Sequence, residues 1–394
     1  MGGKGIKDKV AIVGMGCLRF GELWNKSLDD MMVEAAYEAL QGAGLTPDDI
    51  EAYWLGTCFS GNCGITLSVP LKIQYKPVTR VENFCATGSD AFRNACYAVA
   101  SGAYDMVMAI GAEKIKDSGY SGLVIPPPTD DGTNTNYSAP AAFSLLAPAY
   151  FKKYGLDPQK GKEVLARIAW KNHKNGALNP KAQFRMEVPM EKILKSPMVA
   201  EPLGIMDCSG MADGAAAAII VRAEDAHKYN KNPMYVKGLS IACGSGHGAL
   251  HQDYDFTSVL ETVHAARDAY SQAGVTDPRK QISLAEVHDC FTPTELVLYE
   301  DLGFSQRGKG WEDVTNGVFD LDGELPVNPD GGLKSFGHPI GASGLRMLYE
   351  CWLQFRGEAG PRQIKNPTLG LTHNMGGFPW ECVASVCIVG REPG

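Results

Sequence analysis

An internal repeat is the feature that most constrains the fold of this 394-residue chain. A helical pattern, an Ala-Gly pair and an extended segment occur near the N-terminus and return 230 residues later, with the glycines at Gly44 and Gly274. Each glycine stands where a C-terminal helix cap belongs. The strand before each helix also recurs, at residues 10–13 and 235–241. The repeat predicts two related α/β halves, each with a sheet and covering helices.

A second element is duplicated in the same way. The segments CATGSDAFRNACYAVASG, from Cys85, and GHPIGASGLRMLYECWLQF, from Gly337, both pass from small residues into a mostly apolar helix. A helix that is apolar on most sides is typically buried between layers. Continuous apolar runs follow at residues 106–110 and 368–372, as in strands covered on both faces. We expect the two buried helices to pack against each other, with their N-terminal ends near a shared axis.

The segment between the repeats has a different character. Residues 118–202 hold three consecutive prolines and polar turns, and we expect helices there only near residues 141–154 and 161–174. We interpret this segment as an inserted loop domain that covers the site. The predicted division is an N-terminal half over residues 1–233, including the insertion, and a C-terminal half over residues 234–394.

Composition narrows the class of protein. Hydrophobic residues make up 44% of the chain and charged residues 21%, which are ordinary globular values. The formal net charge of −8 gives no basic footprint for nucleic acid or an anionic membrane. The apolar run at the N-terminus is too short to span a bilayer. Eleven cysteines without a CxxC pair fit neither a zinc module nor a disulfide framework, so we expect a reducing cytoplasm.

Two ligand patterns lead to negative predictions. His247 and His251 have the i, i+4 spacing of metal ligands but lie in the glycine-rich stretch CGSGHGALH, which is not expected to be helical. We therefore predict no metal. The string GMGCLRFG lacks the GxGxxG pattern, so no dinucleotide site is predicted either.

Cys85 is the candidate nucleophile. It lies between an expected apolar strand and a helix, where unpaired backbone N–H groups favour an anion. We expect this position to lower the thiol pKa and to produce a thiolate that takes an acyl group from a thioester. The alternative is a buried structural cysteine. The small residues that follow, Ala86 to Ser89, keep the approach uncrowded and count against that alternative.

Other candidate groups lie at equivalent chain positions. His338, in GHPIGASG, could take the Cys85 proton and then donate a hydrogen bond, although it could equally be a helix-capping histidine. His288 and Cys290, in VHDCF, are two apart on an extended segment and should point the same way, one to polarise a carbonyl and one to move a proton at the adjacent carbon. Gly376, in THNMGGF, is expected in a tight turn whose N–H groups form an oxyanion hole or simply belong to a loop.

Four segments together resemble the thiolase superfamily: VENFCATGSDAF, HDCF, NPDGGLKSFGHPIGASG and HNMGG. The similarity is to the sterol-carrier-protein type, in its bacterial and archaeal branch without a fused lipid-transfer domain. It implies the thiolase fold, in which two duplicated β/α halves form a five-layer α-β-α-β-α arrangement, usually as a homodimer or dimer of dimers. It also implies roles for individual residues: acyl acceptor for Cys85, activator for His338, enolate oxyanion binding for His288, acid/base for Cys290, and oxyanion-hole or substrate binding for Gly376 and Asn374.

One departure from the biosynthetic and degradative thiolases affects the acid/base. Those enzymes carry Asn-Glu where this chain has His288-Asp289, and a late Cys-x-Gly where it has Asn374-Met375-Gly376. Within the sterol-carrier-type branch, the resemblance implies that Cys290 replaces the missing cysteine. Cys382 and Cys387 look like strand residues.

The resemblance implies thiolytic cleavage of a 3-oxoacyl-CoA, or the reverse Claisen condensation, with coenzyme A as a substrate and no tightly bound cofactor. The branch includes acetoacetyl-CoA thiolases (acetyl-CoA acetyltransferases) and a thiolase subunit that cuts benzoylsuccinyl-CoA. Its members often work with a small zinc-ribbon/OB-fold protein subunit. Several aromatic residues are candidates either for a roomy acyl pocket or for the core: Phe84, Phe92, Tyr137, Phe143 and Phe378.

Three rival functions stay open on the sequence. A retro-aldolase of the same fold would not need the acyl-cysteine, and Cys85 with GHPIGASG counts against it. A decarboxylating ketoacyl synthase fits the HDCF and HPIGASG strings poorly. A non-catalytic acyl-CoA-binding thiolase-like subunit would not need both cysteines and both histidines.

Overall fold

The computed structural model describes residues 5–117, 138–251 and 253–394, with the side chains of residues 247 and 250 left out. The first part of the predicted loop domain, including its three prolines and Tyr137, therefore falls outside the described residues. The division of the chain at residues 233 and 234 stays a prediction.

The described residues form one nine-stranded sheet and one two-stranded ribbon. The N-terminal strands of the large sheet are β1 (Val10–Cys17), β2 (Ala52–Gly56), β3 (Val78–Val81), β4 (Met106–Glu113) and β7 (Gly214–Arg222). Its C-terminal strands are β8 (Met234–Cys243), β9 (Leu284–Glu286), β10 (Leu369–Phe378) and β11 (Glu381–Gly390). The ribbon contains β5 (Met198–Ala200) and β6 (Leu203–Gly204).

The strand order makes the repeat visible. The sheet runs β3-β2-β4-β7-β1-β8-β11-β10-β9, so β1-β7-β4-β2 on one side is matched by β8-β11-β10-β9 on the other. In each set the outer pair is parallel and the other pairs are antiparallel. The two sets join where Ala11 and Ile12 of β1 pair with Tyr235 and Met234 of β8. The predicted duplication is confirmed at the level of topology.

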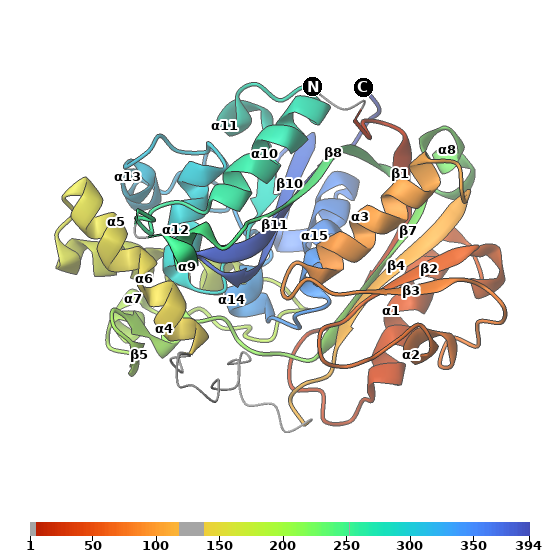
Figure 1. Ribbon diagram of the computed structural model, residues 1–394, viewed down its shortest axis with the longest axis horizontal. Helices are drawn as coiled ribbons and strands as arrows, with labels where there is room; N and C mark the ends of the chain where they lie inside the picture. Colours follow the sequence, from red (N-terminus) through yellow and green to blue (C-terminus); the bar gives the residue numbers. More distant parts are fainter. Residues whose placement is uncertain (1–4, 118–137, 252) are drawn as a thin grey trace.

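Helices cover both outer faces and fill the space between the two sets of strands (Figure 1). Those of the N-terminal half and the insertion are α1 (Leu28–Ala43), α2 (Ile65–Ser68), α3 (Thr87–Ala100), α4 (Ala139–Ser144), α5 (Leu146–Tyr154), α6 (Pro158–Ala177), α7 (Met190–Leu194) and α8 (Ala226–Tyr229). Those of the C-terminal half are α9 (His247–Leu250), α10 (Leu260–Ala273), α11 (Pro278–Gln281), α12 (Thr292–Asp301), α13 (Gly310–Thr315), α14 (Gly332–Phe336) and α15 (Ser343–Arg356).

Three hydrophobic clusters define the layers. One lies between α1 and the outer face of β1, β4 and β7. A second surrounds α3 and α15 and contacts the inner faces of both sets of strands. The third lies between α10, α12 and the C-terminal strands, and also takes in α4 to α6. The predicted five-layer α-β-α-β-α arrangement is therefore present, with α3 and α15 as the central layer.

Glycine allows α3 and α15 to approach closely at their N-terminal ends. A Cβ atom at Gly88 would lie 2.7 Å from the Gly341 carbonyl oxygen, and one at Gly344 would lie 2.5 Å from the Ser89 nitrogen. Real Cβ atoms essentially never come so close to backbone. The expected packing of the two buried helices is confirmed, and the contact at their first turns is made by backbone.

The repeat glycines adopt the predicted conformation. Gly44 ends α1 with φ 68° and Gly274 ends α10 with φ 78°, both in the left-handed region that favours glycine. Both caps return an N–H to the last turn of their helix.

Local expectations fail at three places. Gly376 and Gly377 lie within β10, paired with Val383 and Cys382, and do not form a tight turn. The stretch CGSGHGALH contains the one-turn helix α9, which was not expected. The insertion also forms α7 beyond its two predicted helical regions. In β10 the pairing with β11 supplies the hydrogen bonds that keep a glycine-rich segment extended.

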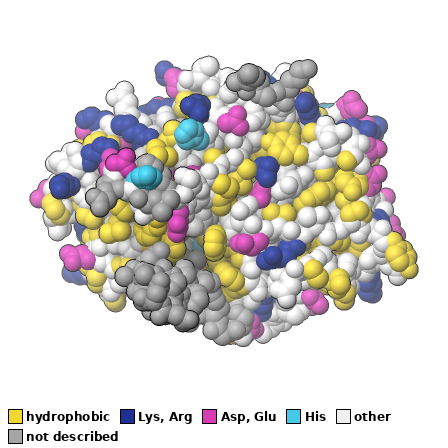
Figure 2. All heavy atoms as spheres, in the orientation of Figure 1, with side chains coloured by type: hydrophobic (Ala, Val, Ile, Leu, Met, Phe, Trp, Pro, Cys, Tyr) yellow, Lys and Arg dark blue, Asp and Glu magenta, His cyan; other side chains and the backbone are white. Residues whose placement is uncertain are grey.

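The surface gives no sign of segregated charge on the face shown in Figure 2, where Lys and Arg are interspersed with Asp and Glu. None of the helices in the described residues has the length and apolar character needed to cross a bilayer. The expected cytoplasmic location and the expected lack of a nucleic-acid partner stay predictions.

Candidate active site

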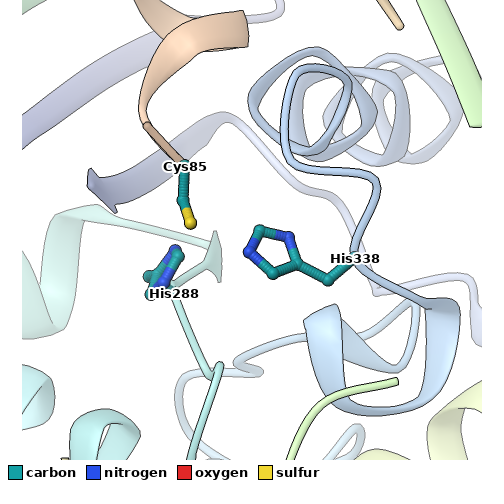
Figure 3. Close-up of side chains that lie close together, drawn as sticks. All are labelled: Cys85, His288 and His338. Carbon is teal, nitrogen blue, oxygen red and sulfur yellow. The ribbon is translucent and has the colours of Figure 1, made fainter. Parts of the chain in front are cut away.

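Three predicted site residues from distant parts of the chain meet in one place. Cys85 stands just before α3, His288 follows β9, and His338 lies between α14 and α15. The Cys85 Sγ atom and one ring nitrogen of each histidine all lie within 4.8 Å of one another, and all three residues are buried (Figure 3). The N-terminal half thus provides the sulfur and the C-terminal half both imidazoles.

A tight turn delivers Cys85 to the start of α3. Phe84, just before it, has φ 46°, which is uncommon for a residue with a side chain. The Asn83 and Phe84 carbonyls accept hydrogen bonds from the Ala86 and Thr87 N–H groups, each at 3.0 Å. Such strained backbone near a reactive side chain is common at functional sites.

The protonation state of Cys85 differs from the sequence-based expectation. Burial, followed by the negative charge of Glu113, raises the pKa of the Cys85 thiol to about 12. The prediction that the helix start lowers this pKa is wrong, because removal of the sulfur from water disfavours the thiolate more strongly. Cys85 is therefore a thiol at neutral pH and needs a base at the moment of attack.

His338 presents a free lone pair to that thiol. The Ser343 hydroxyl donates to the Pro339 carbonyl oxygen at 3.0 Å, so at 2.7 Å it accepts from the Nδ1–H of His338. The proton on Nδ1 leaves Nε2 unprotonated, buried and without a hydrogen-bond partner. Figure 3 shows this edge of the ring facing Cys85. Burial, followed by the charge of Arg346, lowers the pKa of His338 to about 3, so the ring is neutral.

His288 holds the opposite tautomer. The Asn374 side-chain amide donates to His288 Nδ1 at 3.0 Å, and the Ser89 hydroxyl donates to the Asn374 oxygen at 3.5 Å. This chain fixes the amide orientation and leaves the His288 proton on Nε2. Burial keeps the pKa of His288 well below its usual range. The two rings, with centroids 5.5 Å apart, therefore offer one acceptor and one donor to the same space.

Cys290 and Asp289 confirm the predicted alternation along VHDCF. Cys290 lines the same cavity as Cys85 and His288. Asp289 points the other way and accepts from the backbone N–H groups of Leu333 at 2.6 Å and Lys334 at 3.1 Å. Burial raises the pKa of Cys290 well above its usual range, so this thiol also keeps its proton.

Gly376 brings β10 against the nucleophile. A Cβ atom at this position would lie 2.3 Å from the Asn83 carbonyl oxygen and 3.0 Å from the Cys85 nitrogen. Glycine is therefore required for this close approach of two backbones. Asn374, two residues earlier in the same strand, contacts His288 and does not line the cavity. The oxyanion-hole role of Gly376 stays a prediction.

The site opens into a mostly apolar cavity of about 230 Å³. The residues that line it are Phe59, Phe84, Cys85, Ala139, Phe143, His288, Cys290, Ile340, Gly377, Phe378 and Glu381. Three of the aromatic candidates are thus in the pocket, and two of its lining residues come from α4 in the insertion. Phe92, by contrast, is packed in the central core. Tyr137 lies outside the described residues.

Sequence reasoning missed a buried carboxylate that joins the two halves. Glu113, at the end of β4, accepts the backbone N–H groups of Cys58 at 3.0 Å, Phe59 at 2.9 Å and Gly341 at 3.0 Å. It ties the loop after β2 to the segment that carries His338. A lone carboxylate at the end of the apolar run MVMAIGAE was the available signal. Ser89 and Ser343 were also missed, although both lie inside quoted motifs.

Comparison with known proteins agrees with this geometry. Residues 10–224 match the family described as thiolase, N-terminal domain, and residues 242–391 match the thiolase C-terminal domain-like family. The chain belongs to the thiolase family. It is an enzyme of the acyltransferase class.

Named relatives cover nearly the whole of this thiolase. It is 39% identical to an acetyl-CoA acetyltransferase of Methanothermobacter thermautotrophicus over 93% of this chain and 96% of that protein. It is 33% identical to human sterol carrier protein 2 over 93% of this chain and 70% of that protein. Among solved structures, one titled Ltp2-ChsH2(DUF35) aldolase has a TM-score of 0.84 and 25% identity, covering 99% of both chains.

The raised thiol pKa makes the alkylation of this thiolase pH-dependent. Because the thiolate is the reactive form and its fraction rises about tenfold per pH unit below the pKa, iodoacetamide should modify Cys85 ever faster from pH 7 to pH 10. The rate can be followed by mass spectrometry of the Cys85 peptide. A plateau with a midpoint below pH 8 would contradict the neutral thiol.

Ser343 is predicted to position His338. Ser343→Ala removes the acceptor that holds the Nδ1 proton, so we expect kcat to fall about 10- to 100-fold, part of what a general base contributes, with little change in KM. Ser343→Thr should restore much of the rate. Ser335→Ala is a matched control, because that buried hydroxyl donates to the Phe184 carbonyl oxygen instead. Equal losses in both alanine variants would point to packing as the cause.

Proposed function

We propose that this thiolase catalyses CoA-dependent cleavage of a 3-oxoacyl-CoA, or the reverse Claisen condensation, through an acyl group carried on Cys85. The observation that carries the proposal is the meeting of the Cys85 sulfur, an imidazole acceptor and an imidazole donor within 4.8 Å at the end of an apolar cavity. A nucleophile, a base and an oxyanion donor are the parts that acyl transfer needs.

In the cleavage direction each group has one task. His338 Nε2 takes the Cys85 proton as the sulfur attacks the 3-oxo carbon. The bond between carbons 2 and 3 breaks, and the released acyl-CoA enolate accepts a hydrogen bond from His288 Nε2–H. Cys290, which keeps its proton at neutral pH, donates that proton to carbon 2. The thiol of coenzyme A then attacks the acyl-cysteine and carries the shortened acyl group away, with the Gly376 and Cys85 N–H groups as the proposed second oxyanion hole.

Coenzyme A is thus a substrate in this proposal, and the reaction needs no tightly bound cofactor. Relatives named acetyl-CoA acetyltransferase support the class of chemistry.

The cavity favours a bulky or aromatic acyl group over acetyl. An apolar cavity of about 150 Å³ is enough to bind benzene, and the cavity beside Cys85 measures about 230 Å³ with four phenylalanines in its lining. An acetyl group would leave most of it unfilled. We therefore propose an aryl or branched 3-oxoacyl-CoA such as benzoylsuccinyl-CoA, with acetoacetyl-CoA as the alternative.

Partners and location complete the proposal. A structural neighbour is titled as a complex with a DUF35 protein. We propose that this thiolase likewise works in the cytoplasm with a small zinc-ribbon/OB-fold subunit, as a homodimer or dimer of dimers.

A panel of 3-oxoacyl-CoA esters tests the substrate class. We expect kcat/KM for an aryl ester to exceed that for acetoacetyl-CoA at least about tenfold, the scale on which a fitted apolar pocket discriminates. Mass spectrometry of the intact protein should show the corresponding acyl adduct on Cys85. A higher kcat/KM for acetoacetyl-CoA would remove the bulky-substrate proposal and leave the acetyltransferase.

A retro-aldolase is the second candidate, because the structural neighbour at 25% identity carries that title. Such an enzyme would cleave a 3-hydroxyacyl-CoA without added coenzyme A and without an acyl adduct. Cleavage of that kind, undiminished in Cys85→Ser, would replace the thiolase proposal. Neither activity together with tight acyl-CoA binding would indicate a non-catalytic subunit.

A further inference from the structure

The three converging side chains of the site also have the composition of a metal centre. Cys85, His288 and His338 supply one sulfur and two imidazole nitrogens, all buried and within 4.8 Å of one another. In a tetrahedral zinc site with metal–ligand bonds of 2.0 to 2.3 Å, the ligand atoms lie about 3.3 to 3.8 Å apart. Movements of about 1 Å in side chains that line a cavity would close the difference.

His338 already meets both requirements of a zinc ligand. Its Nε2 atom has a lone pair, is buried and lacks a hydrogen-bond partner. Its Nδ1–H donates to Ser343, and such a second hydrogen bond orients most metal-bound histidines.

His288 needs one local rearrangement. Its Nε2 atom faces the same space but carries the proton, because Nδ1 accepts from Asn374. Rotation of the Asn374 amide by 180° would let its oxygen accept from Nδ1–H and would free Nε2. The Ser89 hydroxyl, now a donor to the Asn374 oxygen, can equally accept from the amide nitrogen. The surrounding hydrogen bonds therefore allow both tautomers.

We propose that the unacylated enzyme binds one Zn²⁺ through Cys85 Sγ, His288 Nε2 and His338 Nε2, with the fourth position open to the cavity, and that this metal blocks the nucleophile. Binding forms a zinc–thiolate bond and releases the thiol proton to solvent. One cysteine and two histidines with an open position is a donor set of the zinc type. The metal is an inhibitor here, because it occupies the sulfur electrons that acyl transfer requires.

Cobalt titration tests the site directly. Co²⁺ added anaerobically to the unacylated full-length enzyme should give, at one equivalent, a thiolate-to-cobalt charge-transfer band and the intense visible bands of a four-coordinate site. Zn²⁺ should displace it. Zn²⁺ should also slow iodoacetamide alkylation of Cys85 at least about tenfold, and a chelator should reverse the effect.

Variants separate this site from other thiols. Cys85→Ser should lose the charge-transfer band, whereas Cys63→Ser and Cys243→Ser, which replace exposed cysteines, should keep it. Asn374→Asp should tighten zinc binding about 10- to 100-fold, since a carboxylate is the better acceptor for His288 Nδ1–H.

Three outcomes would overturn the proposal: no band at one equivalent, a band that survives in Cys85→Ser, or no tightening in Asn374→Asp. The blocking role rests on the proposed function, but every readout uses the protein without a CoA ester. A failure of zinc binding is therefore distinguishable from a failure of thiolase activity.

Discussion

Cys85→Ser should lower the rate of thiolysis by about four orders of magnitude or more, the scale of loss when a covalent nucleophile is removed. A hydroxyl is a much weaker nucleophile than a thiol beside a neutral imidazole, and it forms an ester in place of a thioester. Steady-state release of acyl-CoA measures the rate, and intact-protein mass spectrometry measures the acyl adduct. Both should be lost together, because cleavage is proposed to pass through the adduct.

The matched control for this change is Cys63→Ser. Cys63 is exposed, whereas Cys85 is only 7% exposed, so the same substitution should leave the rate within a factor of two. Normal trapping of labelled acyl groups by Cys85→Ser would refute the assignment of the nucleophile.

Cys290→Ala should separate the two half-reactions. Acyl transfer between Cys85 and coenzyme A uses His338 and should continue at a reduced rate, while carbon–carbon cleavage should fall at least about a hundredfold, the lower bound for loss of a general acid. Exchange of labelled coenzyme A into an acyl-CoA reports the first step. Solvent deuterium entering carbon 2 of acetyl-CoA reports the second, and it should cease.

Cys382→Ala is the control for this variant. Cys382 is also buried but contacts Glu261 on β11, away from the cavity lining. If Cys290→Ala retained unchanged thiolysis or deuterium exchange, Cys290 would have no part in proton transfer. Loss of both half-reactions to the same extent would instead indicate that the variant disturbs the position of His288.

The fold was predictable because the repeat is strong at short range. A helix cap at Gly44 and its counterpart at Gly274 can be recognised from local sequence, and the duplicated CATGSDAF and GHPIGASG segments predict the central layer. The relative position of Cys85 and His338 then follows from the symmetry of two equivalent helix starts. The structure agrees on each of these points.

The protonation of the site was not predictable in this way. The tautomer of His288 depends on Asn374 and Ser89, which are 86 and 285 residues from their partners in that hydrogen-bonded chain. The thiol pKa depends on burial and on Glu113, which come from the assembled fold. Gly376 was assigned to a turn because two adjacent glycines resemble one locally, whereas the partner strand keeps them extended.

The glycine contact at the first turns of α3 and α15 also separates reactivity from selectivity. The distance between nucleophile and base is set by two main chains that meet at Gly88, Gly341 and Gly344, and main chains have no rotamers to change. The acyl cavity is set by phenylalanine side chains on other segments. The choice of substrate can therefore be altered by replacing those rings, while the reaction itself keeps a fixed frame.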